Sequence, residues 1–470
     1  MDVGLEKQLR ALRAEEYGAG VVNKHAPLRM CLLYPSPYHV AMSSLGFLQI
    51  HRLANRRPGT VCERAFLPEK RAIEIHRRTR TGLMCLESLR PVNDSDLIGI
   101  SVAYELELAG LVTALELSGL APLAAERDEA DPLVILGGPL TFSNPLPAAP
   151  FADLVVLGEG ETKLNWILDY LEENPEAARG SKKARTKFLE LCAEQDGILV
   201  PSLHGEYLPQ IAKADDDSLP AVSEIYTPNT ELSDMVLIEP ERGCHRGCTF
   251  CVMRRSTNGG MRLVSPDKFL HLVPDKVGKV GLVGAAVTDH PRIKDILRAL
   301  IEEKGKRIGI SSLRADRLDE EFVSLLTQGG YRSMTVAMDA PSERLMDQIE
   351  KNLRHRHLEK TAELAKQFRM KHLKVYTVAV LPDETDEDIE ALINSDHLNY
   401  DDKIMYIEKY FFTKEKKIKK NVIKKFEKIN LDCDNFLKTF LNYELKLFEE
   451  LQLSWKNILV TFITEYQDHL

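Results

Sequence analysis

The segment Glu241–Cys251, Glu-Arg-Gly-Cys-His-Arg-Gly-Cys-Thr-Phe-Cys, carries more chemical information than any other part of the chain. It places Cys244, Cys248 and Cys251 at C-x3-C-x2-C spacing, with Phe250 before the last cysteine. Three thiolates on one loop suit three irons of a 4Fe–4S cluster, which takes four cysteines when fully ligated. No fourth cysteine lies near, so we expect one iron to stay open. An open coordination position is typical of a reactive metal site.

A structural zinc site is the alternative for these cysteines. Structural zinc takes four protein ligands, usually from two pairs of cysteine or histidine residues. His245 lies between the first two cysteines, where the short spacing makes simultaneous ligation awkward, and no second pair follows. The sequence therefore favours the cluster.

Arginines crowd this segment. They form either an ordinary solvated loop or a positive rim that favours an anionic cluster and an anionic ligand group. The sequence leaves both interpretations open for Arg242, Arg246, Arg254, Arg255 and Arg262.

Composition narrows the class of protein. The 470 residues are 44% hydrophobic, which is typical of a soluble globular protein. The sequence has no apolar run of about 18 residues, so we expect no membrane span. The charged start leads us to expect no secretory signal. Eight cysteines without a pairing pattern indicate a reducing compartment, so we expect a cytoplasmic protein. A formal charge of −9 makes a nucleic-acid partner unexpected.

The first half of the chain predicts a doubly wound, Rossmann-like α/β domain over residues 28–175, after a helical lead-in at 1–27. Its expected parallel strands are Leu28–Tyr34, Asp96–Val102, Leu133–Leu136 and Leu154–Leu157, and its expected helices include Tyr104–Ser118 and Glu161–Glu172. Glycine-bearing turns follow two strands, at 137–139 and 158–161. Ligands of such sheets bind at the carboxyl ends of the strands.

A mixed linker at 176–230 leads to a second β/α alternation over 231–393. A first strand ends near Leu237, and further strands are expected at Lys279–Val283, Arg307–Ser311, Arg332–Met338 and Leu373–Val380. The intervening helices are expected at Arg292–Glu303, Asp319–Thr327, Ser342–Glu350 and His357–Phe368. This alternation predicts a partial β/α barrel, in which chemistry takes place on the loops after the strands. The cysteine segment follows the first strand.

The composition changes after Ile393. Residues 394–470 contain no Gly, Pro, Ala or Arg, whereas Lys, Asn, Ile and Phe are common. This tail is either a helical appendage, since Phe436, Phe440, Leu447 and Leu451 fall at helical spacing, or a segment foreign to the rest.

These residues resemble the radical S-adenosylmethionine (radical SAM) superfamily. The cysteine motif with Phe250 and the β/α alternation after it carry the resemblance. The N-terminal part is similar to the cobalamin-binding-like domain of one branch, through Val-Ile-Leu-Gly-Gly-Pro at 134–139 and Val-Val-Leu-Gly-Glu-Gly-Glu at 155–161. The resemblance covers roughly residues 28–392.

The resemblance implies a mechanism. The open iron would bind the amino and carboxylate groups of S-adenosylmethionine (SAM), and an electron would cleave SAM to methionine and a 5′-deoxyadenosyl radical. The implied cofactors are the 4Fe–4S cluster and SAM, with cobalamin left open. The implied partners are a one-electron donor such as a flavodoxin or ferredoxin, and a small-molecule or macromolecular substrate that the sequence does not identify.

The resemblance also implies a SAM site on the barrel. Gly284, Ala285 and Ala286 stand where relatives often have Gly-Gly-Glu near the methionine amino group, so the acid is missing and backbone contacts are expected from Gly284 and Ala285. Ser311 and Arg314 follow the third strand, where polar groups meet the cofactor. Asp339 stands where relatives often have Glu. Surface-turn or capping roles are the alternatives, and Ser342 is a natural N-cap.

Two departures from the family pattern concern the barrel end. Val380–Thr385 replaces Gly-Leu-Pro-Gly-Glu-Thr, so both glycines are lost where the backbone would approach the adenine. A sixth strand is not recognisable, although Ile404–Phe412 has the propensity for one.

Alternatives remain for function. The Asp-x-His-x-x-Gly motif of histidine-ligated cobalamin is absent, and His39 is expected to be a loop residue. A methylthiotransferase-like modifier of tRNA or protein would need a second cluster on Cys31, Cys62 and Cys85, but Cys31 lies in an apolar strand, as core cysteines do. A non-catalytic iron–sulfur protein is the third hypothesis.

Overall fold

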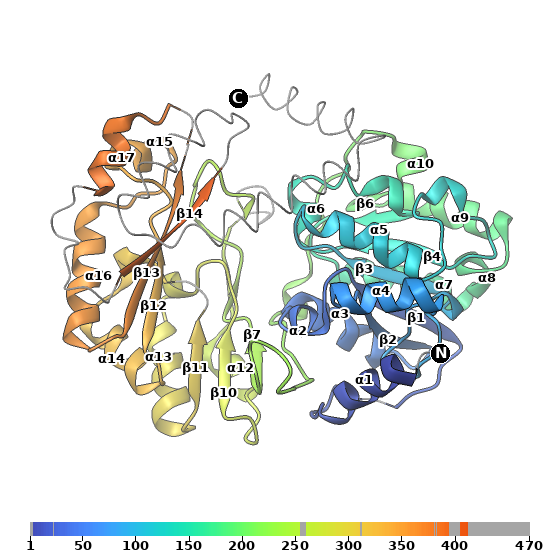
Figure 1. The fold of residues 1–470 in the computed structure, drawn as a ribbon, viewed down its shortest axis with the longest axis horizontal. Coiled ribbons are helices and arrows are strands. Elements are labelled where there is room, and N and C mark those ends of the chain that lie inside the picture. The colour runs from blue at the N-terminus through green and yellow to red at the C-terminus, as the bar shows by residue number, and fades with distance from the viewer. Residues whose placement is uncertain are drawn as a thin grey trace.

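The computed structural model describes residues 3–21, 23–253, 260–310, 313–379, 381, 383–393 and 405–411. The chain forms two α/β units, an N-terminal sheet with helices on its faces and a C-terminal array of parallel strands with helices outside (Figure 1).

The first unit is a six-stranded sheet. Its strands are β1 (Leu28–Tyr34), β2 (Thr60–Phe66), β3 (Leu97–Ser101), β4 (Leu133–Gly137), β5 (Leu154–Val156) and β6 (Ile198–Leu199). Its helices are α1 (Val3–Ala14), α2 (Tyr38–Ala41), α3 (Leu45–Arg56), α4 (Lys70–Thr79), α5 (Glu107–Leu117), α6 (Leu140–Ser143), α7 (Glu161–Glu173), α8 (Pro175–Ala178), α9 (Lys182–Ala193) and α10 (Pro201–His204).

The strand order β2-β1-β3-β4-β5-β6 makes this a doubly wound sheet, as predicted. The first five strands are parallel and β6 is antiparallel to β5. The order reverses between β1 and β3, and such a switch point opens a crevice at the carboxyl ends of the strands. β6 and α9 lie within the predicted linker.

Buried residues cover both faces of this sheet. One core contains Met30, Leu32 and Phe47, and the other contains Leu33, Ile100 and Leu136. Because alternate residues of a strand point to opposite faces, a continuously apolar strand such as β1 serves both cores.

The second unit is an open β/α barrel. Its strands are β7 (Met235–Ile238), β10 (Lys279–Leu282), β11 (Arg307–Ile310), β12 (Ser333–Ala337), β13 (His372–Ala379) and β14 (Met405–Phe411), with a small hairpin of β8 (Glu241–Arg242) and β9 (Arg262–Leu263). Its helices are α12 (Pro266–His271), α13 (Ile293–Arg298), α14 (Glu320–Gln328), α15 (Glu343–Gln348), α16 (His355–Gln367) and α17 (Asp386–Ile393).

The barrel strands form two parallel groups of three, β7-β10-β11 and β12-β13-β14. A parallel bridge between Leu313 and Val336 connects the groups. The partial barrel predicted from the sequence is therefore confirmed.

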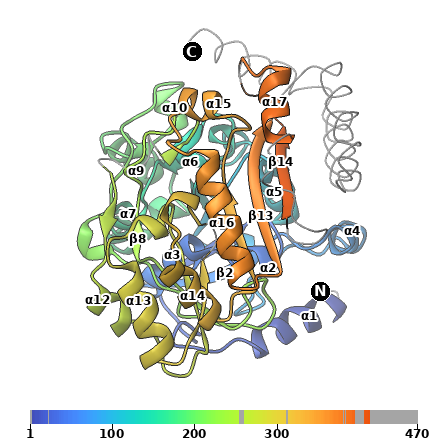
Figure 2. The ribbon, with the colours of Figure 1, turned by 90° about the vertical axis from the view of Figure 1, so that its left-hand side faces the viewer.

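β14 is the sixth barrel strand, and it comes from the segment of unusual composition. It pairs with β13 from Leu373–Met405 to Ala379–Phe411, and the two strands lie side by side at the barrel edge (Figure 2). The segment 404–412, for which the sequence offered only strand propensity, thus contains the sixth strand. The tail positions expected to be helical, Phe436, Phe440, Leu447 and Leu451, lie outside the described residues.

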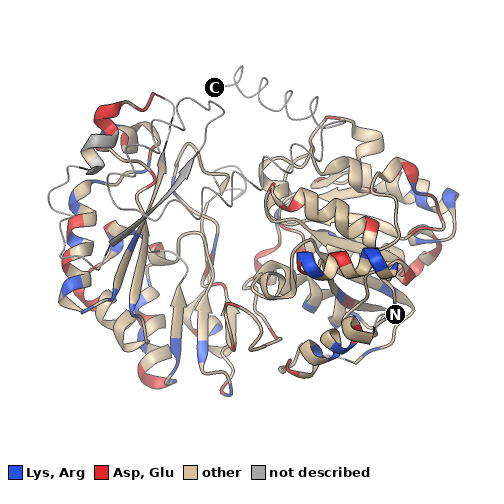
Figure 3. Ribbon diagram, in the orientation of Figure 1, with Lys and Arg blue, Asp and Glu red and all other residues tan. Residues whose placement is uncertain are grey.

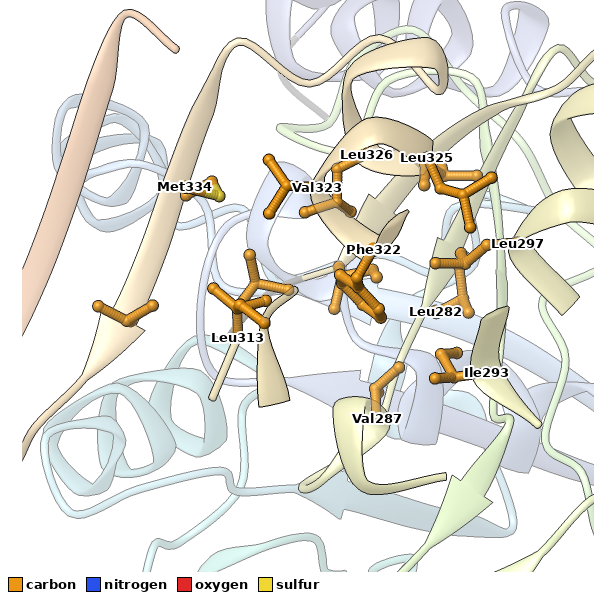
Figure 4. Packing of buried hydrophobic residues seen from close by; sticks show 14 of the residues in the cluster. Leu282, Val287, Ile293, Leu297, Leu313, Phe322, Val323, Leu325, Leu326 and Met334 are labelled. Carbon is orange, nitrogen blue, oxygen red and sulfur yellow. The ribbon is translucent and has the colours of Figure 1, made fainter. Parts of the chain in front are cut away.

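One core holds the barrel together. Leu297 of α13 and Phe322, Leu325 and Leu326 of α14 pack with Leu282 of β10 (Figure 4). Phe322 is almost fully buried. Truncating such a phenylalanine typically costs about 3–5 kcal/mol, so these helices fix the strands whose ends bear the site.

The surface gives two coarse results. Lys and Arg are interspersed with Asp and Glu over both units (Figure 3). Within the described part of the chain, no helix has the length and apolar character needed to cross a membrane.

Candidate functional site

The cysteine loop begins just after β7, at the carboxyl edge of the barrel, and the β8–β9 hairpin closes its base. Cys248 is buried, Cys244 and Cys251 are half-buried, and all three are free thiols. The backbone N–H of Thr249 donates to the carbonyl oxygen of Ile349 at 3.0 Å, which ties the loop to the end of α15.

The thiols influence one another electrostatically. Burial raises the pKa of Cys244 and of Cys248; Cys248 and Cys251 raise the pKa of Cys244 further, and Cys251 raises that of Cys248. Lys351 and Arg314 act in the opposite direction on Cys248. Positive charge beside thiols favours the thiolate, which is the form that binds metal.

The described residues contain no group of three His, Cys, Asp or Glu side chains placed to hold a single metal ion. A cluster binds each of its cysteines on a different iron, so its thiolates need not converge on one point. Free, mutually interacting thiols with nearby cations fit the donor set of a cluster.

Lys351 forms an ion pair with Asp339, and both side chains are largely buried. Asp339 follows β12 and has a φ of 61°, in the left-handed region that non-glycine residues seldom adopt. Its backbone N–H donates to Tyr376 at 3.2 Å. Backbone strain of this kind is concentrated at functional sites.

A second ionic group holds the loop from the other side. Arg246 donates to Asp289 at 2.9 and 3.0 Å, and Arg317 donates to the same carboxylate at 2.7 Å. Burial opposes ionisation of Asp289, but the two arginines outweigh it and lower its pKa to about 2. Asp289 therefore anchors the cysteine loop to the segments after β10 and β11.

Glu241 is a buried carboxylate at the start of this loop. Its Oε1 accepts a hydrogen bond from the backbone N–H of Ala286 at 2.8 Å, whereas its Oε2 has no hydrogen-bond partner in the described structure. Burial is the main reason that its pKa is raised to about 7. A Cβ on Gly284 would lie 2.1 Å from Oε1, so only glycine lets the turn after β10 approach the carboxylate this closely.

The predicted SAM-site residues have different surroundings. Gly284 lies over Glu241, and Ala285 is exposed on the same turn. Arg314 donates to Asp316 at 3.0 Å and, like Asp339, acts electrostatically on Cys248. Ser311 lies outside the described residues, as do Arg254 and Arg255.

Three residues of the site were not predicted: Glu241, Asp289 and Lys351. Glu241 could have been suspected, because a charged residue in a strand that leads into a metal loop is unusual. Lys351 and Asp289 gave no local signal, because Cys248, on which Lys351 acts, and the arginines that bind Asp289 lie far away in sequence.

The segment that replaces the family glycines keeps one glycine-like conformation. Asp383 has a φ of 61°, and its carbonyl oxygen accepts a hydrogen bond from Arg344 at 2.9 Å. The N-cap prediction for Ser342 is confirmed, because its hydroxyl accepts a hydrogen bond from the N–H of Leu345 at 3.3 Å.

The N-terminal unit contains the histidine and the three cysteines that the sequence offered as further cofactor ligands. His39 is partly exposed in α2 and lies 3.7 Å from Glu69. Cys31 and Cys85 lie in one core and Cys62 in the core on the opposite face of the sheet, so these cysteines pack as core residues.

The switch-point crevice has one feature of its own. The Glu107 carboxylate joins the loops after β1 and β3, because it accepts hydrogen bonds from the Ser36 hydroxyl at 2.9 Å and the Ala103 N–H at 2.6 Å. Tyr104 and Leu106, which lie between Ala103 and Glu107 in the sequence, are exposed.

Together, the fold and site define a β/α-barrel protein with three free cysteines after its first strand and an N-terminal doubly wound domain. Residues 46–201 match the family described as radical SAM proteins, N-terminal, and residues 238–395 match the radical SAM superfamily. The chain belongs to the radical SAM superfamily. It is an enzyme of that class, with a 4Fe–4S cluster and SAM as cofactors and a need for an external electron donor.

The chain is similar to two archaeal proteins in sequence and to a solved structure in fold. The uncharacterized protein MJ0966 of Methanocaldococcus jannaschii is 26% identical over 375 residues, covering 78% of this chain and 72% of the relative. The uncharacterized methyltransferase PH0819 of Pyrococcus horikoshii is 22% identical over 315 residues, covering 64% and 66%. The radical SAM methyltransferase TsrM of Kitasatospora setae, solved with tryptophan and a SAM analog, has a TM-score of 0.52 at 15% identity, covering 78% and 70%. At that identity the likeness concerns the fold.

Proposed function

We propose that Cys244, Cys248 and Cys251 hold the cluster, and that the enzyme transfers a methyl group to a carbon of its substrate with the help of cobalamin. The observation that carries the cluster site is a set of three free thiols at the barrel's carboxyl edge, with two cations acting on the most buried one. When bound, the reduced cluster and SAM supply the electron and the 5′-deoxyadenosyl radical. The chain's own residues bind, orient and exclude water.

Glu241 is our candidate for the amino end of SAM. A buried carboxylate oxygen without a partner is costly unless a ligand supplies a donor. The amino group of SAM would supply such a donor, and Glu241 lies in β8, just before the cysteines. Relatives often have an acid after the two residues that correspond to Gly284 and Ala285, and this chain lacks it. Glu241, in β8, then takes the role of that acid.

The rest of the SAM site remains as predicted. Backbone groups of Gly284 and Ala285, together with Ser311, Arg314 and Asp339, form the proposed contacts. The pair of Asp339 and Lys351 supports this assignment, since it fixes the carboxylate of a residue with a strained backbone, and both charges act on Cys248.

Cobalamin binding is proposed for the crevice at the switch point of the N-terminal sheet. Exposed Tyr104 and Leu106 offer an apolar surface there for a large flat ligand, and a Cβ on Gly137 would meet no atom within 4 Å, which leaves open space beside it. The residues do not fit histidine ligation of cobalt. Two similar proteins are named as methyltransferases, which favours methyl transfer as the reaction class.

The organisation and setting of the enzyme are proposed as follows. Residues 28–175 bind cobalamin, 176–230 connect the units, 231–393 carry the radical chemistry, and 1–27 and 394–470 flank them. The free cysteines favour the reducing cytoplasm, with a flavodoxin or ferredoxin as donor.

One anaerobic experiment tests the proposal. The full chain is reconstituted with iron and sulfide, reduced with dithionite, and supplied with SAM. We expect 5′-deoxyadenosine and about four irons per chain, the content of one cluster. An intact cluster that releases none would favour the non-catalytic alternative, and about eight irons would favour the methylthiotransferase alternative. Visible absorbance after incubation with hydroxocobalamin and gel filtration tests cobalamin binding.

A further inference from the structure

The base of the cysteine loop contains two arginines that face each other. In the β8–β9 hairpin, Arg242 is the direct cross-strand partner of Arg262. Like charges directly opposite one another destabilise a pair of strands, and each of these strands has only two residues. The hairpin therefore depends on anions from outside it.

Glu239 before the hairpin and Asp216 supply two of these anions, at 2.8 Å from Arg242 and 3.2 Å from Arg262, and the N-terminal unit supplies the buried ones. Arg242 lies 2.8 Å from Glu161 and 3.6 Å from Glu159, and Arg262 forms an ion pair with Glu159. The Glu159 and Glu161 side chains are only 6% and 7% exposed, so solvent screens these pairs weakly. Glu159 also accepts the backbone N–H of Ala214 at 2.8 Å, which fixes its carboxylate.

Glu159 lies in the turn between β5 and α7, and Glu161 is the first residue of α7. Turns at the carboxyl ends of parallel strands commonly hold ligands. Here the carboxylates are directed to the arginines of the other unit, and both arginine side chains are 14% exposed. The turn therefore serves as a contact between the two units.

We propose that Glu159 and Glu161 are positioning residues for the iron–sulfur cluster. Through Arg242 and Arg262 they hold the two ends of the cysteine loop together, so that docking of the N-terminal unit sets the geometry and shielding of the cluster. This inference rests on the proposed cluster site.

The test uses the full-length reconstituted protein without SAM. Glu159→Gln, Glu161→Gln and the double variant remove the largely buried carboxylate partners of the two arginines, and leave Arg242 with Glu239 and Arg262 with the exposed Asp216. We expect the double variant to lose iron to a chelator roughly tenfold faster, equivalent to about 1.4 kcal/mol. We also expect a changed electron paramagnetic resonance line shape of the reduced cluster. Glu173→Gln, an exposed residue at the other end of α7, is the matched control.

A charge exchange separates positioning from general instability. Glu161→Arg combined with Arg242→Glu should recover iron retention and line shape relative to either single change. The inference would be overturned if the rate of iron loss and the line shape stay unchanged when Glu159→Gln and Glu161→Gln are combined. Cys248→Ala tests the cluster site separately from the positioning role of the glutamates, because iron retained in that variant would overturn the proposed cluster site itself.

Discussion

Replacing Glu241 with glutamine should change how the stability of the barrel depends on pH. The Glu241 carboxyl has a pKa of about 7 in the folded protein and 4.5 as an ordinary glutamate. The cause is mainly burial, which the hydrogen bond from Ala286 offsets in part. Between these two values the folded protein binds more protons than the unfolded chain. Its free energy of unfolding therefore falls as the pH rises.

The size of the effect follows from the two pKa values. The whole shift corresponds to about 3 kcal/mol, complete above pH ~8. Between pH 6 and pH 8 the loss is roughly 1 kcal/mol, because most of the titration near the folded pKa falls in this interval. For a unit of this size that is a change of about 2–4 °C in the unfolding temperature. Glutamine can still accept the Ala286 N–H but does not titrate.

The assay is thermal unfolding of the reconstituted protein at pH 6 and pH 8, with and without SAM. The wild-type protein should lose about 2–4 °C more than Glu241→Gln between these pH values. The exposed Glu363→Gln on α16 should behave like the wild type. SAM should reduce the difference, because a donor on Oε2 stabilises the ionised carboxylate.

SAM affinity provides the second measurement. Loss of a charge-assisted hydrogen bond should weaken binding by roughly ten- to a hundredfold in Glu241→Gln. Identical pH dependence in the two proteins, together with equal SAM affinity, would refute the assignment of Glu241.

Substitutions at three other positions test the site. Cys248→Ala should remove the visible absorbance of the cluster and abolish 5′-deoxyadenosine release; a retained cluster would contradict the ligand assignment. Lys351→Met should lower stability in urea by roughly 1–3 kcal/mol, because it leaves Asp339 unpaired, whereas Lys351→Arg should not. Asp383→Ala should unfold more easily than Asp383→Gly by about 1 kcal/mol, since alanine resists a φ of 61°; equal melting temperatures would exclude strain there.

The fold could be predicted where strands are buried on both faces. Leu28–Tyr34 has the same bounds as β1, because its apolar run serves two cores. β2 was missed because Glu63 and Arg64 interrupt its apolar pattern. Arg64 is nevertheless fully buried, held by Glu16 and Glu87 at 2.7 Å. Such pairing across long stretches of sequence leaves no local pattern.

Of the candidate site, only the cysteine motif could be predicted from the sequence. The cysteine spacing identifies ligands because the metal requires them close together in sequence. Lys351 acts on Cys248 from about a hundred residues further along the chain, and Glu161 reaches Arg242 across the interface between units. Only the folded arrangement of the strands and turns brings these charges together.

The sixth strand has a practical consequence for the design of shortened proteins. β14 covers the backbone edge of β13 along seven residue pairs, from Leu373 to Ala379. A chain ended after Ile393 would present the N–H and C=O groups of that edge to solvent, where another copy could add a strand. Shortened proteins should therefore self-associate through β13, so β14 protects this edge from other copies of the chain.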